Sequence, residues 1–310
     1  MERKKRMSLI RLEAEADYLG ERIDKYLGAV LEGRSRSYVQ KLMKEGAVLV
    51  NKSTVKASYR LEEEDQIEVE IPEPEEPNIE AENIPLSILY EDQDLLIVDK
   101  PKGMVVHPSA GHLSGTLVNA VLYHCRGQLS GINGVLRPGI VHRIDKDTTG
   151  ALAVCKNDEA HNHVAAQLKA HSIMRKYRAI VSGILKEDEG VIDAPIGRHP
   201  IDRKKMAVNE KNGKRAVTHY RVLARLSGYT YVECQLETGR THQIRVHMAS
   251  IGYPLLGDMV YGSGKNPYHL QGQTLHAQVL GIIHPTSGDY LEVEAPLPEY
   301  FTKLLRMLKK

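Results

Sequence analysis

The chain has 310 residues, enough for one large domain or two of ordinary size. Hydrophobic residues make up 42% of it and charged residues 26%, as in soluble globular proteins, so the chain can bury a real core. Its formal net charge is only +2, which excludes a protein that is basic all over. Any surface that binds nucleic acid must therefore be local.

The cysteines and the N-terminus indicate a compartment. Cys125, Cys155 and Cys234 are odd in number and far apart, and the last two lie in apolar runs. We expect buried, reduced thiols in a reducing environment. The basic start, residues 1–6, is not followed by an apolar leader segment, and no stretch reaches membrane-spanning length. The sequence thus predicts a cytoplasmic protein with no membrane partner.

Composition shifts divide the chain into four parts. The segment Pro72-Glu73-Pro74-Glu75-Glu76-Pro77 combines prolines, which fix φ and lack an N–H donor, with glutamates that repel one another. We expect an extended linker here. The predicted parts are an N-terminal tail (1–18), a small module (19–71), an acidic, proline-rich linker (72–86) and a large domain (87–310).

The small module has helical and strand signals in a simple order. Apolar residues at helical spacing begin at Ile23 and predict a first helix. Ser35 or Ser37 can cap a second helix, and Gly46 can end it in a left-handed conformation. Strands over 48–50 and 66–71, with a turn at Asn51-Lys52, complete a small α/β module.

The same module has a one-sided charge. The segment from Arg34 to Arg60 contains several basic residues but a single acid, Glu45, and the basic residues lie on the predicted helix and the turn after it. A solvated face is the alternative, but this layout is typical of phosphate binding. The pattern over residues 19–71 also resembles an S4 RNA-binding domain. The predicted RNA ligands here are Arg34, Arg36, Lys41, Lys44 and Lys52.

The large domain mixes strand-like and helix-like segments without a regular βαβ rhythm, which predicts an α+β fold with a mostly antiparallel, mixed sheet. The expected strands are 95–99, 151–155, 177–182, 217–226, 229–236 and 290–294. The expected helices are 158–171, capped by Asn157, 241–251, ended by Gly252, and 300–309.

One polar cluster stands in an otherwise apolar context. It reads His142-Arg143-Ile144-Asp145-Lys146-Asp147-Thr148-Thr149-Gly150, just before a strand that we expect to be buried. So many charges beside a core are costly unless they form a site, although a charged connecting loop is the common alternative.

The segment 142–150 resembles the central motif of the RluA-type pseudouridine synthases. Three further matches follow the family's order along the chain, at 96–108, 176–179 and 236–247, with Gly257-Asp258 downstream. The last of them, which includes Gly239-Arg240-Thr241-His242-Gln243-Ile244-Arg245, resembles the family's late arginine motif. The chain looks most like the RluD-type members, which act on ribosomal large-subunit RNA and also have an S4 domain. The resemblance therefore implies a pseudouridine synthase catalytic domain.

The resemblance also implies the catalytic residues. Asp145 would be the carboxylate that attacks C1′ of the target ribose or takes a proton from C2′, with Asp147 the rival by residue type. Arg245 would form the ion pair that keeps Asp145 charged, while Arg240, placed before the helix, suits a phosphate contact. Tyr177 would stack on the target base.

Further residues are expected to bind the substrate. His142 and Arg143 would help to extrude the nucleotide, because the glycosidic bond cannot be attacked inside a stacked helix. For His142 a structural hydrogen bond remains open. Arg240 and Thr149 complete the predicted substrate contacts. A basic segment over 203–215, with a turn at Asn212-Gly213, reads as a hairpin on RNA phosphates, with ligands Arg203, Lys204, Lys205 and Lys214.

Neither a metal nor a cofactor is expected. His161 and His163 lie on different faces of their helix, and the isomerisation has no redox step. The expected partner is ribosomal RNA, the helix 69 region by resemblance, or a pre-ribosomal particle, bound by a monomer. Alternatives are a synthase acting on transfer RNA, a noncatalytic RNA-binding or ribosome-assembly protein, and a glycoside or nucleoside hydrolase, which would usually need a second acid.

Overall fold

The computed structural model describes residues 7–72, 79–108, 112–134, 136–202 and 205–309. The chain divides into two compact units between residues 76 and 77, inside the predicted linker. The later part of that linker belongs to the second unit: the backbone N–H of Glu82 donates to the carbonyl of Asn119, and the Asn119 amide donates to the carbonyl of Glu80. The linker predicted over 72–86 is therefore too long.

The first unit contains an antiparallel sheet of four described strands in the order β1-β4-β2-β3. These are β1 (Met7–Glu13), β4 (Gln66–Pro72), β2 (Val48–Val50) and β3 (Ser53–Thr54). The predicted tail over 1–18 is wrong in its second half, because β1 pairs with β4 along its whole length and a short 3-10 helix, η1 (Ala16–Tyr18), follows. Ile10 and Leu12 pack against the core of the unit.

The helices of the first unit are α1 (Ile23–Val30) and α2 (Arg36–Lys44). The predicted signals are confirmed: the Ser35 side chain accepts the N–H of Tyr38, and Gly46 follows α2 with φ 76°. Asn51 and Lys52 both have positive φ, as a tight turn between β2 and β3 requires.

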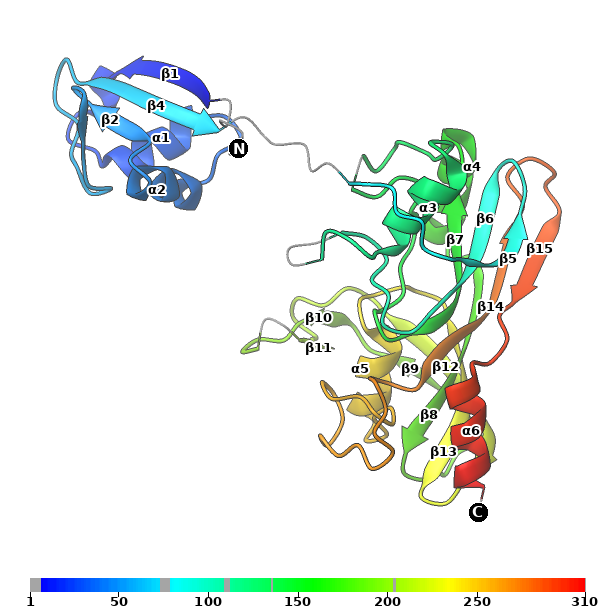
Figure 1. The fold of residues 1–310 in the computed structure, drawn as a ribbon. Helices are drawn as coiled ribbons and strands as arrows, with labels where there is room; N and C mark the ends of the chain where they lie inside the picture. Colours follow the sequence, from blue (N-terminus) through cyan, green and yellow to red (C-terminus); the bar gives the residue numbers. More distant parts are fainter. Residues whose placement is uncertain (1–6, 73–78, 109–111, 135, 203–204, 310) are drawn as a thin grey trace. The chain divides into compact units, whose positions relative to one another are not determined.

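The second unit is built on a mixed sheet of nine described strands (Figure 1). Its order is β5 (Ser87–Glu91), β6 (Leu95–Lys100), β7 (Thr149–Cys155), β14 (Leu275–Ile283), β8 (Met174–Ser182), β13 (Tyr229–Leu236), β12 (Val217–Arg225) and β9 (Glu189–Asp193), with β15 (Tyr290–Glu294) also pairing with β14. Among these strands only β7 and β14 pair in parallel, so the α+β, mostly antiparallel prediction is confirmed.

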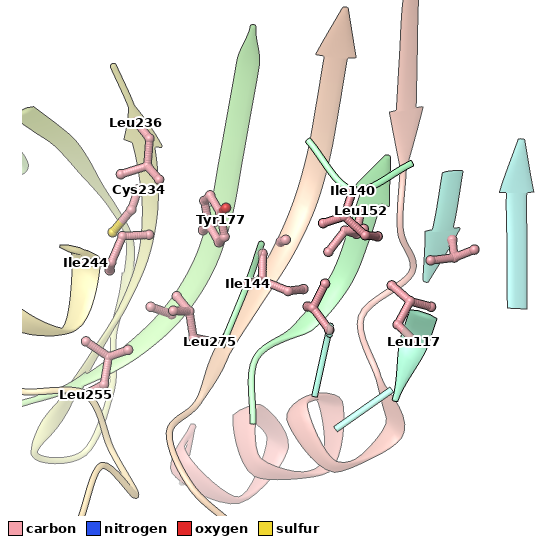
Figure 2. Packing of buried hydrophobic residues seen from close by; sticks show 14 of the residues in the cluster. Leu117, Ile140, Ile144, Leu152, Tyr177, Cys234, Leu236, Ile244, Leu255 and Leu275 are labelled. Atoms are coloured by element: carbon pink, nitrogen blue, oxygen red, sulfur yellow. The ribbon is translucent and has the colours of Figure 1, made fainter. Parts of the chain in front are cut away.

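Helices cover both faces of this sheet. They are α3 (Leu117–Cys125), α4 (Asp158–Lys169), α5 (Gln243–Ser250) and α6 (Glu299–Leu308). Leu152 and Val154 pack with α3 and α5 on one face, whereas the alternate residues Ala151 and Ala153 pack with α4 on the other. Tyr177 lies on the first face with Cys234, Leu236 and Ile144 (Figure 2), so the motifs around positions 145, 177 and 245 meet on one side of the sheet.

A short hairpin lies beside α5 (Figure 1). It consists of β10 (Ile196–Arg198) and β11 (Met206–Val208). The turn predicted at Asn212-Gly213 is present, closed by the N–H of Gly213, which donates to the carbonyl of Asn209, but it follows β11 and is not the turn of this hairpin. Ile196 and Val246 share a small apolar cluster, which joins the hairpin to α5.

The three cysteines are buried and unpaired, as expected. Within the described ranges, no helix has the length and apolar character needed to cross a bilayer.

Candidate active site

The second unit contains an open cavity of about 400 Å³ on the face of the sheet that carries Tyr177. Three parts of the chain that are far apart in sequence contribute to its walls. The loop before β7 contributes Asp145, strand β8 contributes Tyr177, and helix α5 contributes Arg245. The motifs singled out in the sequence thus surround one space.

The loop that presents Asp145 is fixed through its backbone. The N–H of Thr148 donates to the carbonyl of Asp145 at 3.1 Å. The next carbonyl, that of Lys146, accepts from the N–H of Gly103 and from Nζ of Lys100, each at 3.0 Å. Lys100 is completely buried, and this burial lowers the pKa of its ammonium to about 7 against the opposing charges of Asp147 and Asp145.

Arg245 forms the predicted ion pair with Asp145. Its Nη1 donates to Oδ2 of Asp145 at 3.0 Å. The helix α5 directs the guanidinium inward, as predicted, and the residue is 6% exposed. Burial disfavours the charged form, yet the bonds and charges of Asp258 and Asp145 outweigh it and raise the pKa of Arg245 above its ordinary value. A permanent cation therefore stands beside Asp145.

Tyr177 lines the cavity from β8 and is buried. Burial raises the pKa of its hydroxyl, the nearby charge of Arg175 opposes this, and Asp145 adds to it. The tyrosine is therefore a neutral phenol at pH 7, which suits a ring that stacks on a base.

His142 lines the same cavity but has a backbone partner. Its Nε2 accepts the N–H of Ala153 at 2.9 Å. Burial, helped by the charge of Arg175, lowers the pKa of this imidazole to about 4. The structural hydrogen bond left open by the sequence is therefore present, and the ring is neutral at pH 7. The neighbouring Arg143 is exposed at the cavity rim.

Arg240 also lies at the cavity, and its Nε donates to the carbonyl of Arg215 at 3.0 Å. Thr149, in contrast, does not fit its predicted contact with the substrate. It is the first residue of β7, buried, with its hydroxyl 2.8 Å from Nδ1 of His276. The cavity is lined by Thr148 instead.

The rival carboxylate, Asp147, faces elsewhere. Its side chain lies against Gly272, where an added Cβ would come within 2.6 Å of it. Its charge acts on Lys100 and on Lys102. It is not among the described residues that line the cavity.

The basic residues of the first unit fall into two groups. Lys41, Lys44 and Lys52 are exposed, and the Arg34 guanidinium lies 5.2 Å from the ring centre of Tyr38. Arg36 differs because its guanidinium binds the buried carboxylate of Asp24, although half of its side chain is exposed. Its contact with RNA stays a prediction.

The Asp24 site has a structural character. Arg22, Arg36 and Gln40 all donate to this carboxylate, which has no exposed side-chain surface. Burial raises its pKa, but these bonds outweigh burial and bring the pKa down to about 2.

In the second basic segment, Lys205 is half-buried and Lys214 is exposed. The backbone of Lys214 exchanges hydrogen bonds with Ile196, next to the hairpin that packs on α5. The other two predicted ligands, Arg203 and Lys204, lie outside the described residues.

Several cavity residues escaped the sequence reasoning. Nε2 of His242 lies 3.8 Å from Oδ1 of Asp145, and its Nδ1 is 2.8 Å from the hydroxyl of Tyr261. His242 has φ 57°, an uncommon conformation for a residue with a side chain. Arg175, Arg137 and His107 also line the cavity. His242 and His107 lie in matched motifs, but neither motif indicated a role for its histidine, and Arg175 and Arg137 had no sequence signal of their own.

One cluster away from the cavity has the residue types of a metal site. Asp92, Asp94 and His284 offer ligand atoms within 4.8 Å of one another. Their oxygens already accept other bonds, however: Asp92 binds Nε2 of His284 and the hydroxyl of Tyr90, and Asp94 binds the hydroxyl of Thr286. The cluster is a hydrogen-bonded network that joins two loops.

Comparison with known families agrees with this geometry. Residues 94–250 match the RNA pseudouridylate synthase family, and residues 21–67 match the S4 domain. Asp145, Tyr177 and Arg245 fall within the first match, and the helices α1 and α2 fall within the second.

Individual relatives cover nearly the whole chain. An uncharacterized RNA pseudouridine synthase of Bacillus subtilis is 54% identical over 98% of this chain and 99% of its own length. Ribosomal large subunit pseudouridine synthase D is 48% identical in Zymomonas mobilis and 44% in Pseudomonas aeruginosa, each over 94% of this chain; the match covers 95% and 93% of their respective lengths. Among solved structures, human RNA pseudouridylate synthase domain containing 1 superposes with a TM-score of 0.56 at 26% identity, over 74% of this chain and 96% of its own.

Proposed function

The chain belongs to the RNA pseudouridylate synthase family and is an RNA pseudouridine synthase of the RluD type with an S4 domain, and from this premise we propose that it isomerises uridines of 23S ribosomal RNA in the helix 69 region. Two of its relatives are named ribosomal large subunit pseudouridine synthase D. The observation that supports the chemistry best is the ion pair of Asp145 and Arg245 in a cavity shared with Tyr177.

Asp145 is the residue that acts on the sugar. Isomerisation must break the bond from C1′ to N1, turn the uracil and form a bond from C1′ to C5, with the C5 proton lost and N1 protonated. An ionised carboxylate beside the ribose begins this sequence by attacking C1′ or by taking a proton from C2′. The side chain of Asp145 is 16% exposed, so it is shielded yet reachable from the cavity.

Arg245 holds that carboxylate in place and balances its negative charge. The guanidinium fixes one oxygen, Oδ2, and leaves Oδ1 facing the cavity side, where His242 lies. Tyr177 then provides the surface on which the everted base stacks.

The cavity rim receives the nucleotide once it has left its helix. Arg143 and Arg240 are placed to meet phosphates on either side of the target. The first unit adds contacts through its exposed lysines. We further propose that the enzyme acts in the cytoplasm as a monomer, on ribosomal RNA or a pre-ribosomal particle.

The test is a map of pseudouridine in cells that lack the gene. We expect pseudouridines in the helix 69 region of 23S ribosomal RNA to disappear and to return with the wild-type gene. A gene coding for the Asp145→Asn variant should not restore them. Transfer RNA mapped in the same cells serves as the control. If sites disappear from transfer RNA while those of ribosomal RNA persist, the proposed substrate is wrong.

A further inference from the structure

Arg175 has a position in the cavity wall that the mechanism above does not use. It lies on β8 two residues before Tyr177, so both side chains project from the same face of the strand. The residue is 6% exposed and lines the cavity beside Tyr177 and His142.

The guanidinium of Arg175 lacks a balancing charge. Nη2 donates to the carbonyl of Glu237 at 2.9 Å, whereas Nε is buried without an acceptor. In the part of the chain that the structure describes, no carboxylate forms an ion pair with this residue. Burial lowers the pKa of the Arg175 guanidinium, and only a small opposing effect comes from the neighbouring Tyr177, which is neutral at pH 7. Buried guanidinium groups are normally paired, so this one is held ready for a group that the protein itself does not provide.

The local backbone makes room for the guanidinium. A Cβ added to Gly239 would lie 2.7 Å from Nη1 of Arg175. Because position 239 is glycine, the guanidinium can lie directly against the segment that leads into α5. Arg245, which lines the same cavity, has two carboxylate partners, Asp145 and Asp258. The two arginines therefore have different tasks.

We propose, on the basis of the function given above, that Arg175 donates to a carbonyl oxygen of the target uracil and stabilises the charge that the base gains during the reaction. When the bond from C1′ to N1 breaks, its electron pair leaves with the uracil and spreads onto O2 and O4. A base stacked on Tyr177 has its edge within reach of the neighbouring position on β8. A buried donor aimed at developing negative charge is a strong catalytic device.

A phosphate of the RNA is the competing ligand for this cation. Phosphates of a bound strand stay at the rim of a base pocket, where Arg143 and Arg240 are more exposed than Arg175. Arg175 lies deeper, beside the residue that holds the base. The position of Arg175 thus favours the target base as its ligand over a phosphate of the RNA backbone.

The test compares two RNA substrates that differ in one atom. The target position holds uridine in one and 5-fluorouridine in the other, where fluorine makes the departing base a more stable anion. Loss of the intact nucleoside is measured under single-turnover conditions at saturating enzyme. For Arg175→Gln we expect the reaction of uridine to slow by roughly 100-fold to 1000-fold. The reaction of 5-fluorouridine should slow by a clearly smaller factor, and RNA affinity should not change.

Arg175→Lys and Gly239→Ala are the matched variants. Lysine keeps the positive charge but lacks Nε, so the rate of Arg175→Lys with uridine should lie between those of the wild type and Arg175→Gln. The new Cβ in Gly239→Ala should displace the guanidinium and give the same dependence on the substrate without removing the arginine. Thermal unfolding shows whether each variant is folded.

Three results would overturn the inference: an equal loss with both substrates, a loss confined to RNA affinity as for a phosphate ligand, or an unchanged rate in a folded Arg175→Gln variant. Failure of the proposed function would give a different result from failure of this inference. In that case the wild-type enzyme itself forms no pseudouridine in the ribosomal substrate.

Discussion

Asp258 binds the guanidinium of Arg245 through both of its oxygens, at 2.7 and 3.0 Å. The Asp258 side chain is 1% exposed, and its pKa is lowered because the bonds from Arg245 outweigh burial. The same carboxylate accepts the backbone N–H groups of Val260 and Tyr261. Asp258 therefore orients Arg245 so that Nη1 reaches Asp145.

The first prediction concerns Asp258→Asn. The amide keeps the shape of the side chain but loses its charge and one acceptor, so Arg245 remains buried with only Asp145 as an anion. We expect the free energy of unfolding to fall by about 3–5 kcal/mol, the usual effect of breaking a buried pair. The maximal isomerisation rate should fall as well, with RNA affinity retained. Urea unfolding and single-turnover kinetics measure the two effects.

Asp188→Asn is the control for that variant. Asp188 pairs with Arg225 at 2.7 Å, but its side chain is 84% exposed. Exposed pairs contribute little, so neither stability nor rate should change measurably. Equal effects of the two substitutions would contradict the role given to Asp258.

The second prediction separates two basic residues of the first unit. Arg36→Ala removes one of the two cations that bind the buried Asp24, so the first unit should lose about 1.5–3 kcal/mol of stability. Lys44→Ala should leave stability unchanged, since the side chain is exposed, and should weaken RNA binding with a smaller dependence on salt. Denaturant unfolding and salt titrations of RNA affinity test both. If Arg36→Ala weakened RNA binding without a loss of stability, the structural role given to Arg36 would be wrong.

The third prediction concerns the junction of β7 with β14. A Cβ on Gly150 would lie 2.1 Å from the carbonyl oxygen of Ala277, and its φ is 111°. We expect Gly150→Ala to destabilise the protein by about 3 kcal/mol or more, because backbone must move. Gly252 also has positive φ, 88°, but nothing lies within 4 Å of an added Cβ, so Gly252→Ala should cost only about 1–2 kcal/mol. Similar losses measured for the two by chemical unfolding would show that the junction can adapt.

The fourth prediction is a pH dependence. His142 has a pKa of about 4 in the folded protein, mainly because it is buried, whereas an unfolded histidine titrates near 6.5. Between these values the unfolded chain binds more protons, so stability is lost as pH falls from about 6.5 to 4. His142→Gln can keep the acceptor for Ala153 but does not titrate. The stability of this variant should depend less on pH across that window, and an unchanged slope would mean that other groups cause the loss.

The sequence was sufficient where a local rule decides the outcome. The Ser35 cap and the left-handed Gly46 depend only on neighbouring backbone groups, and both were predicted. Periodic apolar residues placed β13 and β15 at the observed limits. Strand β1 was missed because its pairing partner, β4, lies more than fifty residues away, and this pairing cannot be read from the local sequence.

Within the site, motifs identified the residues but not all of their directions. Thr148 and Thr149 are adjacent but have different surroundings: Thr148, in the loop before β7, lines the cavity, whereas the hydroxyl of Thr149, the first residue of β7, lies beside His276. Whether Arg36 is free or paired depended on finding Asp24, buried on the preceding helix. Arg175 could be found only from its offset of two residues from Tyr177, once β8 was known to be a strand.

The most direct test of the account is the rate of isomerisation by Asp145→Asn at saturating ribosomal RNA substrate, measured together with RNA affinity and beside Asp145→Glu. The account predicts no pseudouridine from Asp145→Asn at unchanged affinity, and a strongly reduced rate from Asp145→Glu, whose carboxylate is displaced by one methylene. A variant with Asn at this position that still formed pseudouridine at a rate near that of the wild type would contradict it.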